Sequence, residues 1–143
     1  MKIAIINGPN LNKLGSRDPS IYGFETLEEI TARLQKEFPE HQFFFYHSNI
    51  EGEIIDFIQG INALDDMLGI VINPGAYSHY SYAIADAMAD SHLPIVEVHI
   101  SNIHAREEFR RTSVTGAQAT AVISGCGCKG YNLAVQYLIY LKS

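Results

Sequence analysis

The stretch Lys2-Ile3-Ala4-Ile5-Ile6-Asn7, followed directly by Gly8-Pro9, sets the fold class of this chain. It is a short run of β-branched residues that ends at two turn formers, which indicates a buried strand. Runs of a similar kind recur along the chain and predict four more strands. These strands are expected over residues 42–46, 68–72, 94–98 and 119–123.

Helical patterns lie between the predicted strands. Thr26 opens the first helix, and Glu29, three residues later, completes a capping box. Ile30, Leu34 and Phe38 form the apolar stripe of that helix. Further helices are expected over residues 51–61, with Ile54, Ile55, Ile58 and Ile61 inward, and over 80–90 and 131–141. The alternation predicts a flavodoxin-like α/β fold, a three-layer sandwich with a five-stranded parallel sheet and helices on both faces.

Composition narrows the class of protein. The 143 residues, with no linker or repeat, predict a single domain over residues 1–143. Apolar residues make up 47% and charged residues 18%, as in a globular protein, and no apolar run approaches a membrane span. The N-terminal run reaches Asn7-Gly8-Pro9 too soon for a signal peptide. The net charge of −6 argues against nucleic acid as a partner. Two closely spaced cysteines fit a cytoplasmic protein.

The segment Gly125-Cys126-Gly127-Cys128-Lys129-Gly130 matches the dinucleotide motif G-x-G-x-x-G. However, no further strand completes a βαβ unit after it, and no acidic residue follows for a ribose. We interpret the segment as a turn that lets the last helix pack closely on the sheet. Cys126 and Cys128 are also too few for a zinc site, since no histidine lies nearby. The sequence therefore predicts neither a cofactor nor a metal.

Ligands of such sheets bind at the carboxyl ends of the strands, which selects the loops 8–25, 73–79 and 99–112. The first loop is long and carries Arg17 and Tyr22, as binding loops and lids often do. Either side chain could instead be solvated surface. In the second loop, Asn73 and His79 are neutral hydrogen-bonding groups that suit the recognition of hydroxyls.

The third loop follows Glu97 and His99, which point to one face of their strand. A carboxylate beside a histidine supports general acid–base work, although a satisfied core histidine is an equally simple interpretation. The backbone amides of Ile100 and Ser101 offer a seat for an anion. Three arginines follow nearby: Arg106, Arg110 and Arg111. They favour a small carboxylate or phosphate ligand, although they could instead only pair with Glu107 and Glu108 on the surface.

Taken together, these motifs resemble type II 3-dehydroquinate dehydratase over essentially the whole chain, to about Leu141. The first loop carries Asn7-Gly8-Pro9-Asn10-Leu11-Asn12, then Leu14-Gly15-x-Arg17-x-Pro19-x-x-Tyr22-Gly23. The second carries Asn73-Pro74-Gly75-Ala76 with His79. The third carries Glu97-Val98-His99-Ile100-Ser101-Asn102 with Arg106-Glu107-Glu108-Phe109-Arg110.

The resemblance implies that the protein converts 3-dehydroquinate to 3-dehydroshikimate by anti elimination through an enolate, without metal or cofactor. Tyr22 would be the base and Arg17 would support its ionisation. Asn10 would stabilise the enolate through a water. His99, held by Glu97, would protonate the departing hydroxyl. This reaction belongs to the shikimate pathway, which supplies chorismate and aromatic amino acids.

The same resemblance implies how the substrate is held. Asn73, His79 and Arg110 would bind the ring hydroxyls, and Ile100 and Ser101 the carboxylate. Asp86 would come from a neighbouring subunit of a dodecamer built from trimers. The sequence itself supports a homo-oligomer, since only Asn132 and Gln136 are polar between residues 131 and 141. The alternative function is a flavodoxin-like phosphate- or nucleotide-binding module, although the first strand ends in neither an aspartate cluster nor a Ser/Thr-rich loop.

Overall fold

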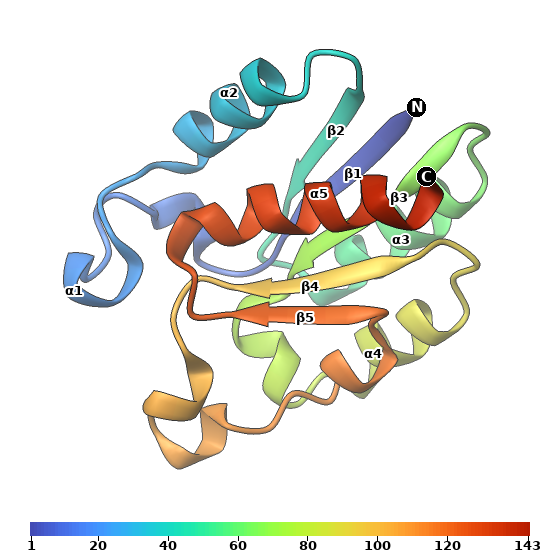
Figure 1. Cartoon of the computed structure of the whole chain (residues 1–143). Coiled ribbons are helices and arrows are strands. Elements are labelled where there is room, and N and C mark those ends of the chain that lie inside the picture. Colours follow the sequence, from blue (N-terminus) through green and yellow to red (C-terminus); the bar gives the residue numbers. More distant parts are fainter.

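The computed structural model describes residues 1–143 and contains one parallel sheet of five strands in the order β2-β1-β3-β4-β5 (Figure 1). All four neighbouring pairs are parallel. The strands are β1 (Lys2–Asn7), β2 (Gln42–His47), β3 (Met67–Asn73), β4 (Ile95–His99) and β5 (Ala121–Ser124). The predicted flavodoxin-like α/β fold is confirmed, and each predicted strand matches an observed one to within two residues at either end.

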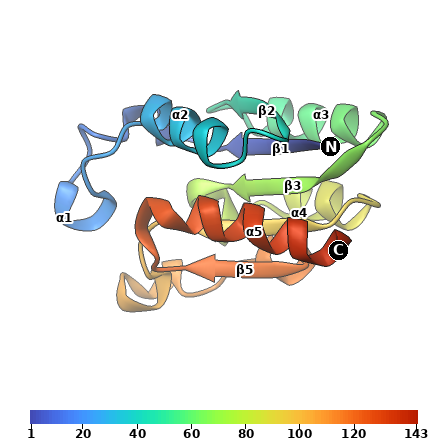
Figure 2. The same ribbon diagram turned by 45° about the horizontal axis from the view of Figure 1, so that its top comes forward.

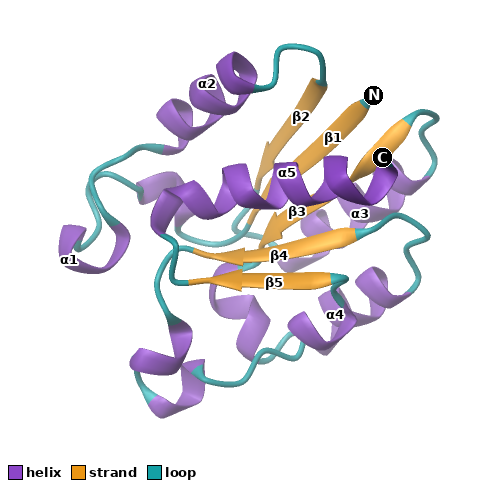
Figure 3. Cartoon of the chain, viewed as in Figure 1, coloured by secondary structure: helices purple, strands orange, loops and turns teal.

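The helices form a layer on each face of the sheet (Figures 2 and 3). One layer consists of α2 (Leu27–Glu37) and α5 (Gly130–Lys142), and the other of α3 (Glu51–Asn62) and α4 (Tyr82–Ala89). The short helix α1 (Pro19–Tyr22) stands clear of both layers, beyond the carboxyl ends of the strands (Figure 1). None of the helices has the length and apolar character needed to cross a membrane.

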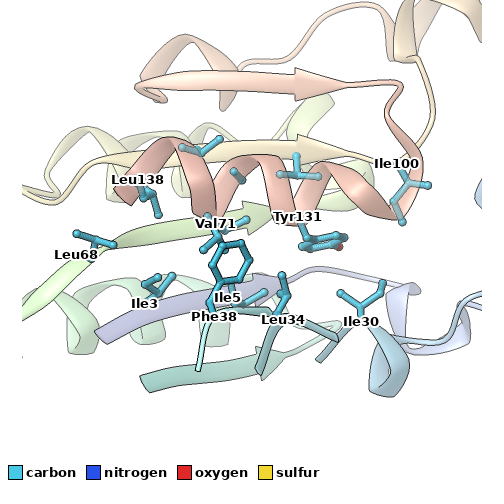
Figure 4. Packing of buried hydrophobic residues seen from close by; sticks show 14 of the residues in the cluster. Ile3, Ile5, Ile30, Leu34, Phe38, Leu68, Val71, Ile100, Tyr131 and Leu138 are labelled. Atoms are coloured by element: carbon cyan, nitrogen blue, oxygen red, sulfur yellow. The ribbon is translucent and has the colours of Figure 1, made fainter. Parts of the chain in front are cut away.

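Each layer encloses its own hydrophobic cluster. The stripe of α2, formed by Ile30, Leu34 and Phe38, packs with α5 on one side of the sheet, as Figure 4 shows. Ile54, Ile58 and Ile61 of α3 are buried in the second cluster, whereas Ile55 is only half-buried at its edge. The sheet is thus covered on both faces, so a ligand can reach it only at the strand ends and the loops that follow them.

Local signals explain the helix boundaries. Thr26 caps α2 by accepting a hydrogen bond from the Glu29 amide, as the capping box predicts. The predicted helix 80–90 is shorter than expected because Ser81, not Tyr80, is its N-cap: the Ser81 hydroxyl accepts the Ile84 amide at 3.0 Å. The expected loop 8–25 contains two short helical turns, Leu11–Lys13 and α1.

Candidate active site

A cleft of about 120 Å³ opens at the carboxyl ends of β1, β3 and β4, where the sequence placed the ligand site. Most of the residues proposed from the sequence line it. They are Asn10, Arg17, Tyr22, Asn73, His79, His99, Ile100, Ser101 and Arg110. Glu97 lies buried behind His99, and Asp86 is exposed on α4 and does not line this cleft. Asp86 can therefore reach a cleft of this kind only from a neighbouring subunit.

Glu97 and His99 are joined directly at the end of β4. Because they are two residues apart on one strand, both side chains project to the same face, and His99 Nε2 lies 2.8 Å from Glu97 Oε2. Two hydroxyls from the segment that leads to β5 also donate to Glu97: Ser113 at 2.6 Å and Thr115. Glu97 is fully buried, so these partners replace its solvation shell.

The environment decides the charge of Glu97. Its burial raises the pKa, but the hydrogen bond and positive charge of His99, with the hydroxyls of Ser113 and Thr115, outweigh burial and hold the pKa of Glu97 below its usual value. A buried carboxylate stabilises the protonated imidazole beside it. Since Nε2 faces Glu97, Nδ1 is the ring nitrogen of His99 left for a ligand in the cleft.

Two arginines converge on the Tyr22 phenol at the other wall of the cleft. Arg17 Nη2 donates to the phenol oxygen at 3.1 Å, and Arg106 Nη1 donates to it at 2.9 Å. The guanidinium of Arg17 also lies 4.1 Å from the centroid of the Tyr22 ring. The phenol oxygen thus accepts hydrogen bonds from two side chains that stay positively charged.

Arg106 is the residue that sequence reasoning left without a role. The sequence placed it in an arginine cluster, four residues before Arg110, so the two would share a face only if the segment were helical. Instead, Arg106 follows the turn Ile103–Ala105, and Arg110 ends a separate turn, Glu108–Arg110. Both nevertheless line the cleft, Arg110 also pairing with Glu107. The position of Arg106 within the family motif was the available signal.

Asn10 is held in a conformation that few residues adopt. Its φ of 68° places it in the left-handed region, where asparagine is among the better-tolerated side chains. The Asn10 amide donates to Asn49 Oδ1 at 2.9 Å, and the Asn49 carbonyl accepts the Tyr77 hydroxyl at 2.7 Å. An uncommon backbone conformation, fixed from a neighbouring loop, is typical of functional positions.

The second loop approaches the first closely, which places Asn73 and His79 in the cleft. A Cβ on Gly8 would lie 2.5 Å from the Pro74 carbonyl oxygen, so only glycine permits this approach. His79 Nδ1 lies 2.9 Å from the Thr112 carbonyl, which can only accept, so Nδ1 carries the proton. Burial lowers the pKa of His79, which leaves Nε2 as a neutral acceptor.

The turn Gly125–Gly130 packs the last helix against the sheet. A Cβ on Gly130 would lie 3.1 Å from a methyl group of Val98, which agrees with the interpretation of this glycine motif as a close-packing turn. Neither cysteine of the turn is paired, and burial raises the pKa of the Cys128 thiol to about 11.

Known proteins match this chain over nearly its whole length. The family model described as "Dehydroquinase class II" matches residues 1–139. The chain is 50% identical over 145 residues to a 3-dehydroquinate dehydratase of Helicobacter hepaticus, covering 100% of this chain and 91% of that protein. It is 51% identical over 137 residues to the 3-dehydroquinate dehydratase of Bacillus subtilis, covering 94% and 91%.

A solved structure gives the same result in three dimensions. The crystal structure of a type II dehydroquinase from Butyrivibrio crossotus superposes with a TM-score of 0.93 at 49% identity, covering 97% of each chain. The resemblance noted in the sequence thus extends to the complete fold.

Proposed function

The chain belongs to the class II dehydroquinase family and dehydrates 3-dehydroquinate in the shikimate pathway, and from this premise we propose how its residues divide the reaction. The observation that carries the proposal is the composition of the cleft wall. No aspartate or glutamate lines the cleft, whereas three arginines do: Arg17, Arg106 and Arg110. The substrate is a carboxylate, and the base has to be found among groups other than carboxylates.

Tyr22 is the proposed base. A proton beside a ketone is weakly acidic, so the base must be strong, and a tyrosinate meets that requirement once cations stabilise it. Arg17 and Arg106 supply those cations through hydrogen bonds of 3.1 and 2.9 Å to the phenol oxygen. Removal of the proton leaves an enolate, and Asn10 stabilises it through a water.

His99 is the proposed acid at the opposite end of the elimination. Hydroxide is a poor leaving group, so the departing oxygen must receive a proton as its bond to carbon breaks. Glu97 orients the imidazole through the 2.8 Å contact between Glu97 Oε2 and His99 Nε2. Tyr22 comes from α1, in the loop after β1, and His99 from the end of β4, which supports an anti elimination with base and acid on different faces of the ring.

Binding of the substrate falls to the remaining groups. Asn73, His79 and Arg110 take the ring hydroxyls, and the Ile100 and Ser101 amides with the Ser101 hydroxyl take the carboxylate. The Ser101 hydroxyl also accepts a hydrogen bond from Arg106 at 3.4 Å, which brings a positive charge beside the proposed carboxylate seat.

We further propose one catalytic domain over residues 1–143, assembled as a dodecamer built from trimers, in which Asp86 enters the cleft of a neighbour. The exposed apolar side chains of α4 and α5 support an assembly, because water would otherwise cover them. They are Tyr82, Leu133, Tyr140 and Leu141. The unpaired cysteines favour a reducing compartment, and the cytoplasm is the proposed location.

An absorbance assay tests the reaction directly. Dehydration creates a conjugated enone, so absorbance should rise when the protein meets 3-dehydroquinate, and equally so with a metal chelator present. Activity that is lost in chelator and restored by a divalent ion would contradict the cofactor-free mechanism. The alternative of a phosphate- or nucleotide-binding module is not favoured, since the matched relatives are 3-dehydroquinate dehydratases.

A further inference from the structure

A buried chain of hydrogen bonds reaches Asn73 from the core, and its other two members, Asn7 and Tyr131, have no role above. The Tyr131 hydroxyl of α5 donates to Asn7 Oδ1 at 2.5 Å and accepts from Asn73 Nδ2 at 3.0 Å. Tyr131 is 0% exposed and lies in the core between α5 and the sheet (Figure 4). One phenol thus joins the last residues of β1 and β3, which face each other in the sheet register.

The direction of these hydrogen bonds has one solution. Asn73 Oδ1 accepts the Gly75 amide at 3.1 Å, so the side-chain nitrogen of Asn73 must face Tyr131. The phenol oxygen therefore accepts from Asn73 and gives its own proton to Asn7. Burial raises the pKa of Tyr131 far above its usual value, so the phenol keeps this proton.

The consequence concerns the proposed substrate contact of Asn73. An amide side chain can turn by 180° and exchange its donor for its acceptor, which would present the wrong group to a substrate hydroxyl. Gly75 and Tyr131 together disfavour that turn. The Gly75 N–H would face the N–H groups of Asn73, and the phenol oxygen, whose proton is given to Asn7, would face the Asn73 oxygen. One N–H of Asn73 is thereby left with a fixed direction for the ligand.

We propose that Tyr131 is a positioning residue for the reaction, which fixes the amide of Asn73 toward a ring hydroxyl of the substrate. The inference rests on the proposed substrate contact of Asn73. It differs from the roles assigned above in that Tyr131 does not line the cleft and acts only through Asn73.

Replacing the phenol by a phenyl ring tests the inference. In Tyr131→Phe, KM for 3-dehydroquinate should rise about tenfold, as when one hydrogen bond to a ligand is misdirected, while kcat changes less than about threefold. Two controls separate positioning from simple loss of stability. Tyr137→Phe alters the same helix at a half-buried ring, and Asn62→Ala removes hydrogen bonds to Ile58, Ser91 and His92 far from the cleft. Both controls should keep the KM of the parent protein.

A double-mutant cycle identifies the route of the effect. If Tyr131 acts through Asn73, the variant carrying both Tyr131→Phe and Asn73→Ala should have the KM of Asn73→Ala alone, within about twofold. Effects that multiply in the double variant would overturn the inference. So would a KM in Tyr131→Phe no higher than in Asn62→Ala at equal loss of thermal stability.

The same measurements distinguish the two levels of the argument. If Asn73→Ala leaves KM unchanged, the proposed substrate contact of Asn73 is wrong and the role of Tyr131 falls with it. If Asn73→Ala raises KM and Tyr131→Phe does not, only the positioning role is wrong. Should Tyr131→Phe fail to fold, Asn7→Ala replaces it. That change removes the acceptor of the phenol proton, so the phenol can donate to a turned Asn73 instead of accepting from it. KM should then rise about threefold, and an unchanged KM overturns the inference.

Discussion

Arg106 and Tyr22 are 84 residues apart in the chain, yet the guanidinium donates to the phenol oxygen at 2.9 Å. The contact joins α1, in the loop that follows β1, to the loop that follows β4. It also adds a second cation at the atom that the proposed mechanism uses as a base. This contact makes the function of Tyr22 dependent on the distant loop as well as on its neighbour Arg17.

Arg106→Ala should therefore weaken the base. The tyrosinate loses one stabilising cation, so the acidic limb of the pH–rate profile should move to higher pH, and turnover near neutrality should fall at least about tenfold. Arg17→Ala should act in the same direction. The pH dependence of kcat is the measurement, and Arg111→Ala is the control, since Arg111 is exposed and does not line the cleft. An unshifted acidic limb in Arg106→Ala would show that the contact has no electrostatic role.

Tyr22→Phe removes the phenol oxygen itself. We expect turnover to fall by about 10²-fold or more, while substrate still binds, because the other groups of the cleft are unchanged. Exchange of the proton beside the ketone with deuterated buffer should stop as well. Tyr80→Phe, at an exposed tyrosine, is the matched control. If Tyr22→Phe exchanges this proton at the parent rate, Tyr22 is not the base and the role passes to His99.

Ser113 and Thr115 should control the acid. Their hydroxyls help to hold the pKa of Glu97 down, so without them the carboxylate that orients His99 becomes protonated at a higher pH. In Ser113→Ala and Thr115→Val the acidic limb of the pH–rate profile should move to higher pH, with a loss of about tenfold on that limb. Ser91→Ala removes a hydroxyl hydrogen-bonded far from the cleft and should leave the profile in place. A uniform loss of rate at every pH would contradict the electrostatic role.

Glu97 should also make stability depend on pH. Its pKa in the folded protein lies below its ordinary value of 4.5, so its contribution is complete above that value and is lost as pH falls through the folded pKa. Glu97→Gln should cost about 3 kcal/mol of unfolding free energy at pH 7. Urea unfolding at pH 7 and below pH 4 should show the difference between parent and variant shrinking in acid. The pKa values of Asp18 and Glu107 are also lowered, but in parent and variant alike, so they do not contribute to the difference in stability.

Asp86 can be tested by mixing two inactive variants. If Asp86 completes a neighbour's cleft, Asp86→Ala should be impaired although every residue that lines the cleft within one chain is unchanged. Joint refolding of Asp86→Ala with Tyr22→Phe should then restore activity at about a quarter of the sites, those that combine an intact Tyr22 with a neighbour's intact Asp86. Sedimentation at micromolar concentration should show an oligomer. A monomeric mass, or no recovery on mixing, would contradict the shared site.

The sequence alone determined the order and type of the secondary structure. The run from Lys2 to Asn7 and the four later strands are short and rich in β-branched or aromatic residues, and turn residues such as Gly8-Pro9 follow the first of them. Local strand propensity and burial therefore point to the same structure. Thr26 and Glu29 likewise defined the start of α2. Glu97 and His99 could be paired from the sequence because the strand repeat places residues two apart on one face.

Only the tertiary structure decided which distant side chains meet. Arg106 donates to Tyr22, and Ser113 and Thr115 donate to Glu97. Tyr131 joins Asn7 to Asn73. No periodicity encodes such pairs, because a hydrogen bond requires two groups to match within a few tenths of an ångström and at a favourable angle. That precision comes from how loops and α5 pack on the finished sheet. The same packing places Arg106 after one short turn and Arg110 at the end of another, so their i,i+4 spacing does not correspond to one helix.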